Sequence, residues 1–272
     1  MSREMMSNNP RTTAGKGSSI AEEQETRAAV PVHILGLPVN VLTMDQAVAT
    51  VRRSWQEEKV FQVVTANVEM LYAGLADREL ARLIREAEMV TADGAGVLLA
   101  ARICGSPLPE RVAGYDLMLA CLREAAREAA PVFFLGARPA VLQEALARAR
   151  ALFPGLIISG SHHGYFQDGE GETIAAEIRL RRPRLLLVAL GAPRQDKWIY
   201  RHKEKLPPCV AIGVGGSLDV LAGKARRAPR WMQRAGLEWL YRLLREPSRL
   251  ARMSVIPLFL LKVTRQRFFG SH

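Results

Sequence analysis

Several strands of this chain are expected to be buried on both faces, and this feature most constrains its fold. Four short runs are predominantly apolar and lack the alternation of a half-exposed strand. They are residues 60–65, 132–136, 184–190 and 209–212. Stretches with helical periodicity separate these runs. The pattern predicts an α/β fold in which helices cover both faces of a parallel sheet.

The basic charge of the chain is concentrated at its C-terminal end. The net charge is +11 over 272 residues, and residues 224–272 hold 12 basic against 2 acidic side chains. Those arginines alternate with Leu, Trp and Phe at helical spacing. Such a segment suits phosphate groups, whether of lipid, of nucleic acid or of a diphosphate-bearing substrate.

Three segments follow from composition. Residues 1–30 are polar, which predicts a disordered tail. Residues 31–223 are expected to form the α/β core. Residues 224–272 are expected to form a helical, basic appendage that binds the membrane. Within the appendage, residues 253–261 suit a helix lying at a lipid interface. No apolar run of about 18 residues predicts a spanning helix, and the N-terminus lacks the pattern of a signal peptide. We therefore expect a protein on the cytoplasmic side.

Asp93 and Arg111 are the leading candidates for chemistry. Asp93 follows the short apolar run at residues 88–92 and precedes Gly94, so it lies where a parallel sheet exposes its carboxyl edge. Arg111 lies in a loop punctuated by Pro and Gly that could fold back over it. Asp-Gly is also a common turn dipeptide, so from local sequence Asp93 is either a general base or a turn former.

Other strand ends carry polar side chains or glycine. Thr65 and Asn67 follow one strand, and Gly136, Gly164, Gly191 and Gly213 follow others, which favours a nucleotide crevice. Asp116 could cap the helix expected at residues 116–128 or contact substrate.

Metal and nucleophile chemistry have little support. There is no D-x-D pair, His162 and His163 are adjacent and would point apart, and Cys104, Cys121 and Cys209 make no metal-binding spacing. There is no nucleophile elbow and no Cys paired with His. We expect neither a bound metal nor a cofactor.

Eight motifs, in this order, resemble those of the WecG/TagA/CpsF glycosyltransferases. They are TAN (65–67), ADGAGV (92–97), ERVAGYDL (110–117), FLG (134–136), GYF (164–166), GAPRQDKW (191–198), GVGGSLD (213–219) and RRAP (226–229). The likeness covers residues 32–252. It implies a Rossmann-like core whose C-terminal appendage meets the membrane.

The resemblance also implies an activity. The family is known for inverting, metal-independent transfer of N-acetylmannosamine or its uronic acid from UDP to a polyprenyl-diphosphate-linked saccharide. It implies Asp93 as general base with Thr65 beside it, and Arg111 and Gln195 as contacts of the reacting sugars or phosphates. Asp196 stands where the family usually has Glu, which leaves that carboxylate's contact in doubt.

Further residues are expected to bind substrate from the strand ends and the appendage. They are Asn67, Gly94, Asp116, Gly136, Tyr165, Gly191, Pro193, Gly213, Gly215, Asp219, Arg227, Arg234 and Arg242. The partners expected are a UDP-sugar, a polyprenyl-diphosphate-linked acceptor and the anionic inner face of the plasma membrane; self-association of the core stays open.

Two other classes are weighed against this one. A nucleic-acid-binding protein would explain the basic end, but no nucleic-acid motif appears and we expect no nucleic-acid partner. A nicotinamide-dependent oxidoreductase would explain Gly213 and Gly215, but Leu218 breaks the G-x-G-x-x-G spacing.

Overall fold

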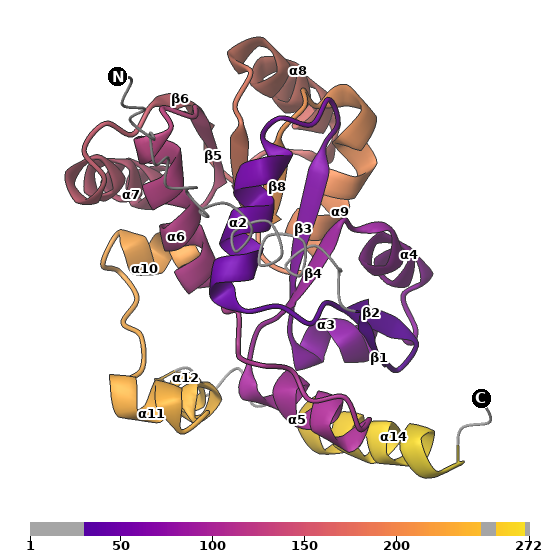
Figure 1. Ribbon diagram of the computed structural model, residues 1–272. Coiled ribbons are helices and arrows are strands. Elements are labelled where there is room, and N and C mark those ends of the chain that lie inside the picture. The colour runs from indigo at the N-terminus through magenta and orange to yellow at the C-terminus, as the bar shows by residue number, and fades with distance from the viewer. Residues whose placement is uncertain (1–29, 246–253, 270–272) are drawn as a thin grey trace, which may run out of the picture. The chain divides into compact units, whose positions relative to one another are not determined.

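A six-stranded parallel sheet forms the centre of the computed structural model, which describes residues 30–245 and 254–269 (Figure 1). The predicted tail therefore lies outside the described residues, apart from Val30. The strand order is β4-β3-β8-β7-β5-β6, and every neighbouring pair is parallel. The strands are β3 (Phe61–Ala66), β4 (Met89–Ala92), β5 (Val132–Gly136), β6 (Ile158–His162), β7 (Leu185–Ala189) and β8 (Val210–Gly213).

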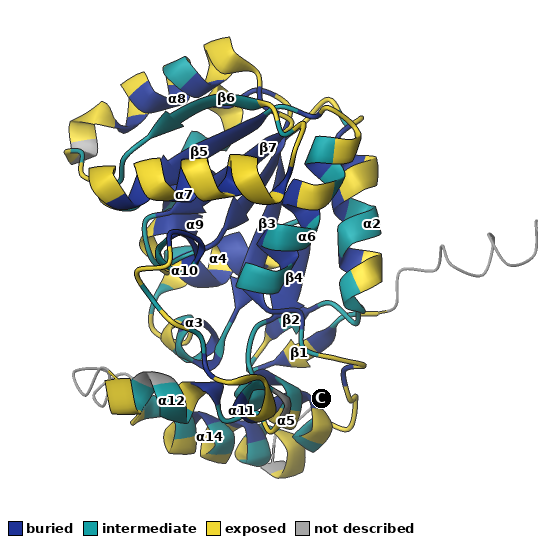
Figure 2. Ribbon diagram, turned by 90° about the vertical axis from the view of Figure 1, so that its left-hand side faces the viewer, coloured by how far each residue is buried: buried dark blue, intermediate teal, exposed yellow. Residues whose placement is uncertain are grey.

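Helices cover both faces of this sheet, as the apolar strands predict. One face packs against α2 (Met44–Ser54), α6 (Gly114–Arg127), α7 (Pro139–Leu152) and α10 (Ser217–Leu221). The other packs against α8 (Gly171–Arg181) and α9 (Arg194–His202). Successive residues of β5 point to opposite faces, since Phe134 belongs to the first cluster and Phe133 to the second. The α/β fold class is confirmed. Strands β3, β4, β5, β7 and β8 are buried along their whole length, whereas the edge strand β6 is half-buried (Figure 2).

A third apolar cluster lies at the β3–β4 end of the sheet and includes residues of both strands. It gathers the hairpin β1 (Val32–Ile34) and β2 (Leu37–Val39) with α3 (Val68–Ala73), α4 (Arg78–Glu86) and α5 (Ala95–Ile103). The hairpin is tied to the other end of the chain, because the backbone N–H of Leu35 donates to Gln266 Oε1 over 2.8 Å.

The appendage is helical, as predicted, and its last helix packs on the core. It contains α11 (Arg230–Arg234), α12 (Glu238–Arg245) and α14 (Val255–Phe269). Helix α14 runs beside α5 and α3, and its Phe259 and Val263 are fully buried in the third cluster (Figure 1). Its Leu261 and Phe268 are exposed. Among the described residues, no helix is both long and apolar enough to span a membrane.

Local signals explain where several helices begin, and one of our expectations is wrong. Thr43 and Gln46 form the capping box that starts α2. Asp116 does not cap α6, because that helix begins at Gly114 and its N-cap position is Ala113, without a side-chain bond. Asp116 is therefore inside the first turn, where its negative charge interacts favourably with the helix dipole. Its carboxylate can still pair with a residue that is distant in sequence.

Candidate active site

Asp93 lies at the carboxyl end of β4, against the end of β3. Its backbone N–H donates to the carbonyl of Ala66 over 2.8 Å, and its side chain is half-buried. Gly94, with φ at 117°, lets the chain turn directly into α5. The residue that follows the strand is thus held at the sheet edge, where a substrate can reach it.

Thr65 and Asn67 lie at the end of the neighbouring strand. The Thr65 hydroxyl donates to the carbonyl of Gly213 over 3.1 Å. Gly114 packs so closely that a Cβ there would lie 3.2 Å from Thr65 Oγ1. Asn67 caps α3 through its side-chain oxygen, 2.9 Å from the Met70 nitrogen.

The Arg111 loop is fastened to the end of β4. The N–H of Val112 donates to the carbonyl of Ala92 over 3.0 Å, and Thr91 Oγ1 donates to the carbonyl of Val112 over 3.3 Å. Arg111 therefore follows the strand end that carries Asp93, as its loop position predicts. Its guanidinium Nη1 donates to Glu238 Oε2 of α12 over 2.7 Å.

Arg227 of the appendage is paired with Asp116 of α6. Its two η nitrogens lie 2.6 Å and 3.1 Å from the two Asp116 oxygens, and its guanidinium lies over the Tyr115 ring. Burial alone would lower the pKa of Arg227, but the hydrogen bond and charge of Asp116, with the charge of Glu238, raise it above its ordinary value. Arg227 is therefore held as a cation beside the Asp93 half of the site.

Gln195 and Asp196 lie in the first turn of α9, against the glycine turn after β8. Gln195 is buried, and its Oε1 accepts from the Gly215 N–H over 2.8 Å. A Cβ at Gly213 would lie 2.6 Å from both Gln195 Nε2 and Asp196 Oδ1, so only glycine fits. Asp196 is 1% exposed, and burial raises the pKa of its carboxyl to about 7, although Gln195 acts in the other direction.

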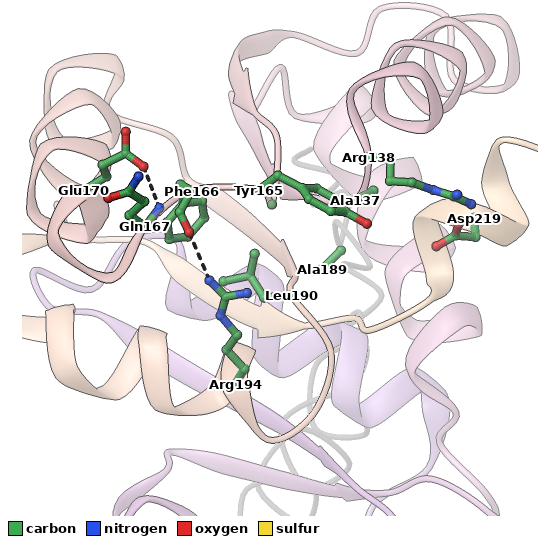
Figure 3. Close-up of a pocket in the computed structure, with 11 residues that line it drawn as sticks. Ala137, Arg138, Tyr165, Phe166, Gln167, Glu170, Ala189, Leu190, Arg194 and Asp219 are labelled. Atoms are coloured by element: carbon green, nitrogen blue, oxygen red, sulfur yellow. Dashed lines mark hydrogen bonds between the residues drawn. The ribbon is translucent and has the colours of Figure 1, made fainter. Parts of the chain in front are cut away.

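A cavity of about 780 Å³ opens at the ends of β5, β6 and β7 (Figure 3). Its wall includes the exposed ring of Tyr165, the carboxylate of Asp219 and the guanidinium groups of Arg138 and Arg194. Arg138 and Asp219 lie at one end of the cavity, and Arg194 lies over the Phe166 ring. Aromatic, anionic and cationic groups together suit a nucleotide.

Two glycines with positive φ follow the strands beside this cavity. Gly136 has φ at 126°, and a Cβ there would lie 2.3 Å from the carbonyl oxygen of Ala189. Gly191 also has positive φ, at 81°, ahead of Pro193 and α9. Glycine at position 136 therefore lets the end of β5 approach β7 closely.

The predicted residues thus fall into two groups along one sheet edge. Thr65, Asp93, Arg111, Gln195 and Gly213 lie around the ends of β4, β3 and β8. Tyr165 and Asp219 line the cavity, and Gly136 and Gly191 follow β5 and β7 beside it. The side chains of Arg234 and Arg242 lie outside the described residues. Over the part of the chain that the structure describes, no three His, Cys, Asp or Glu side chains gather as metal ligands would.

Sequence reasoning missed Glu238 and the cavity cations Arg138 and Arg194. The appendage holds 12 basic residues and only two acidic ones, and Glu238 is one of these two. Its isolation was the signal that the sequence offered. Arg138 and Arg194 each follow a glycine-bearing strand end by two or three residues, so their positions beside the crevice were also readable.

Comparisons with known proteins show the family of this chain. The sequence profile of the Glycosyl transferase WecG/TagA/CpsF family matches residues 32–272. An N-acetylglucosaminyldiphosphoundecaprenol N-acetyl-beta-D-mannosaminyltransferase of Bacillus spizizenii is 37% identical over 201 residues, which cover 74% of this chain and 77% of the relative. The Staphylococcus aureus (strain MW2) protein of that name is 33% identical over 246 residues, 90% and 96% of the two chains. This chain is a glycosyltransferase and belongs to the WecG/TagA/CpsF family.

Proposed function

We propose that this glycosyltransferase moves N-acetylmannosamine, its uronic acid or a related hexose from a UDP-sugar to a polyprenyl-diphosphate-linked saccharide. The relatives' names support the acceptor, since they specify N-acetylglucosaminyldiphosphoundecaprenol. The observation that carries the proposal is the pairing of Asp93 with a nucleotide-sized cavity on the same sheet edge. The product would serve the biosynthesis of a cell-surface polysaccharide or of teichoic acid.

The cavity is the proposed donor site. The Tyr165 ring offers a stacking surface for uracil, and the Asp219 carboxylate can accept hydrogen bonds from ribose hydroxyls. Arg138 and Arg194 supply charge for the diphosphate. The sugar then extends along the edge toward the end of β4.

Asp93 is the proposed general base. It takes the proton of the acceptor hydroxyl as that oxygen bonds to the anomeric carbon, while the bond from that carbon to the UDP oxygen breaks on the opposite side. Such base catalysis is worth about 10²- to 10⁴-fold in rate. The attack inverts the anomeric configuration, and UDP leaves with the electron pair.

Arginine charge replaces a metal in this proposal. Arg111 lies beside the end of β4, and the cavity holds two further guanidinium groups. These cations can stabilise the charge that develops on the leaving diphosphate. Transfer should therefore persist in the presence of EDTA.

The proposed place of action is the inner face of the plasma membrane, where the lipid-linked acceptor lies. Exposed apolar side chains and cations of the appendage support this. They are Trp231, Trp239, Leu244, Leu258, Leu261, Phe268, Arg230, Arg245, Lys262, Arg265 and Arg267. Apolar groups in the acyl boundary and cations at headgroups are typical of an interfacial segment.

Mass spectrometry and NMR of the products test the proposed activity. The full chain is incubated with a panel of UDP-sugars and a polyprenyl-diphosphate-GlcNAc acceptor, with and without EDTA. We expect one added hexose of inverted anomeric configuration, formed equally with EDTA. No product from any UDP-sugar would reject the donor class. In a separate arm, the protein should sediment with anionic vesicles in preference to duplex DNA at equal salt.

A further inference from the structure

The appendage meets the Asp93 end of the core at two neighbouring points. Gly236, in the turn between α11 and α12, approaches α5 so closely that a Cβ there would lie 2.8 Å from the Ala95 Cβ. Ala95 is two residues from Asp93. Glu238, two residues after Gly236, accepts the hydrogen bond from Arg111. The start of α12 is therefore attached to both loops that carry the proposed chemistry.

Four charges alternate across this junction and form what we call the charge ring. Glu238 Oε2 lies 2.7 Å from Arg111 Nη1 and 3.5 Å from Arg227 Nη2. Asp116 lies 2.6 Å from Arg227 Nη1 and 3.9 Å from Arg111 Nη2. The core supplies Arg111 and Asp116, and the appendage supplies Arg227 and Glu238. Each side thus contributes one cation and one anion, and each carboxylate lies between the two guanidinium groups.

The two arginines of the ring are used differently. Asp116 occupies both η nitrogens of Arg227, and Arg227 Nε is buried with no hydrogen-bond partner among the residues that the structure describes. That geometry commits Arg227 to the junction. Arg111 Nη2, at 3.9 Å, is beyond hydrogen-bond distance from Asp116, so this nitrogen can donate to an anionic substrate.

Glu238 is the member that links both arginines from the appendage side, and its side chain is only 10% exposed. A buried carboxylate between two guanidinium groups fixes their separation, because without it the two like charges would repel and move apart. Building on the proposed function, we propose that Glu238 is a positioning residue. It holds Arg111 toward the diphosphate and holds the appendage closed beside Asp93.

Substitution at Glu238 in the full chain tests this role. Glu238→Gln keeps the shape and removes the charge, whereas Glu238→Asp keeps the charge. Glu144→Gln is the matched control. Glu144 of the core and Lys224 of the appendage also form an ion pair, 2.8 Å apart, but both side chains of that pair are exposed. We expect Glu238→Gln to lower kcat at least about tenfold, Glu238→Asp to recover part of it, and Glu144→Gln to match the wild type.

The donor KM separates positioning from competition. None of the four residues of the charge ring is among the described residues that line the cavity, so the donor KM of Glu238→Gln should change less than about threefold. If Glu238 merely occupied the arginines in place of a phosphate, its removal would tighten UDP binding or raise the rate. Either result, or a Glu238→Gln variant with wild-type kcat, would overturn the inference.

Hydrogen exchange separates this inference from the proposed function, because it requires no turnover. Amides of α12 should exchange faster in Glu238→Gln than in the wild type or in Glu144→Gln. If no UDP-sugar is transferred by the wild type but α12 loosens in this way, the donor proposal fails and the junction role of Glu238 stands. If α12 exchanges as in the wild type, the inference fails whatever the wild-type activity is.

Discussion

Replacing Asp196 with asparagine should change how the stability of the protein depends on pH. The Asp196 carboxyl is buried, and this burial raises its pKa from 3.8 to about 7. In the unfolded chain the group loses its proton near pH 4, whereas in the folded chain it keeps the proton to about pH 7. Ionisation therefore favours unfolding increasingly as the pH rises across that interval.

The size of the effect follows from the difference between the pKa of Asp196 in the folded and in the unfolded chain. At about 1.4 kcal/mol per pH unit, the full penalty above pH 7 is about 4 kcal/mol, and roughly 2–3 kcal/mol of it develops between pH 5 and pH 8. The asparagine side chain of the variant does not ionise and carries none of this penalty. Urea denaturation of both proteins should show Asp196→Asn gaining roughly 2–3 kcal/mol on the wild type from pH 5 to pH 8.

Asp77→Asn is the control for this measurement. The hydrogen bond and charge of Lys197 hold the pKa of Asp77 below its ordinary value, so Asp77 stabilises the fold above that value and loses this effect only in more acidic solution. Asp77→Asn should therefore lose nearly the same stability at pH 5 and at pH 8. A pH dependence of Asp196→Asn that matches the wild type would show that the carboxyl is ionised in the folded protein, and would refute the argument from burial.

Three further substitutions test the packing by urea denaturation. Phe259→Ala should cost about 3–5 kcal/mol because the ring is fully buried between α14 and the core, whereas Phe268→Ala, 72% exposed, should stay within about 0.5 kcal/mol; equal effects would mean that α14 is not docked. Gly136→Ala should cost about 3 kcal/mol or more, since Gly136 has positive φ and a Cβ there would lie 2.3 Å from a backbone oxygen. Gly169→Ala is the control, because a Cβ at Gly169 would meet no described atom within 4 Å. Equal stability of the two variants would contradict the close approach at Gly136. Thr43→Ala should cost about 1 kcal/mol through loss of the capping box, and no change would argue against that cap.

The architecture was predictable because its signals are local. A strand that is buried on both faces has an apolar sequence, as β7 does. The capping box at Thr43 likewise marks the start of α2. Asp93 could be placed because it follows a strand directly. The helix start at Gly114 was missed, since Asp116 is as good a capping residue by type as any, and only the backbone conformation decides.

The parts that could not be predicted depend on contacts between distant residues. Arg111 and Glu238 are 127 positions apart, and nothing near either residue specifies the other. The burial of Phe259 likewise depends on where α14 meets α5, which the apolar run at residues 255–261 does not encode. Such a run suits a lipid surface and a protein surface equally well, and in this chain its two sides are divided between the core and the exterior.

Transfer by Asp93→Asn is the most direct test of the central claim. The wild type and the variant are compared for hexose addition to polyprenyl-diphosphate-GlcNAc by mass spectrometry, with circular dichroism to confirm folding and calorimetry to measure UDP binding. The account predicts that the variant folds, binds UDP as the wild type does, and transfers at least about 10²-fold more slowly. Undiminished transfer by Asp93→Asn would contradict the assignment of Asp93 as the base.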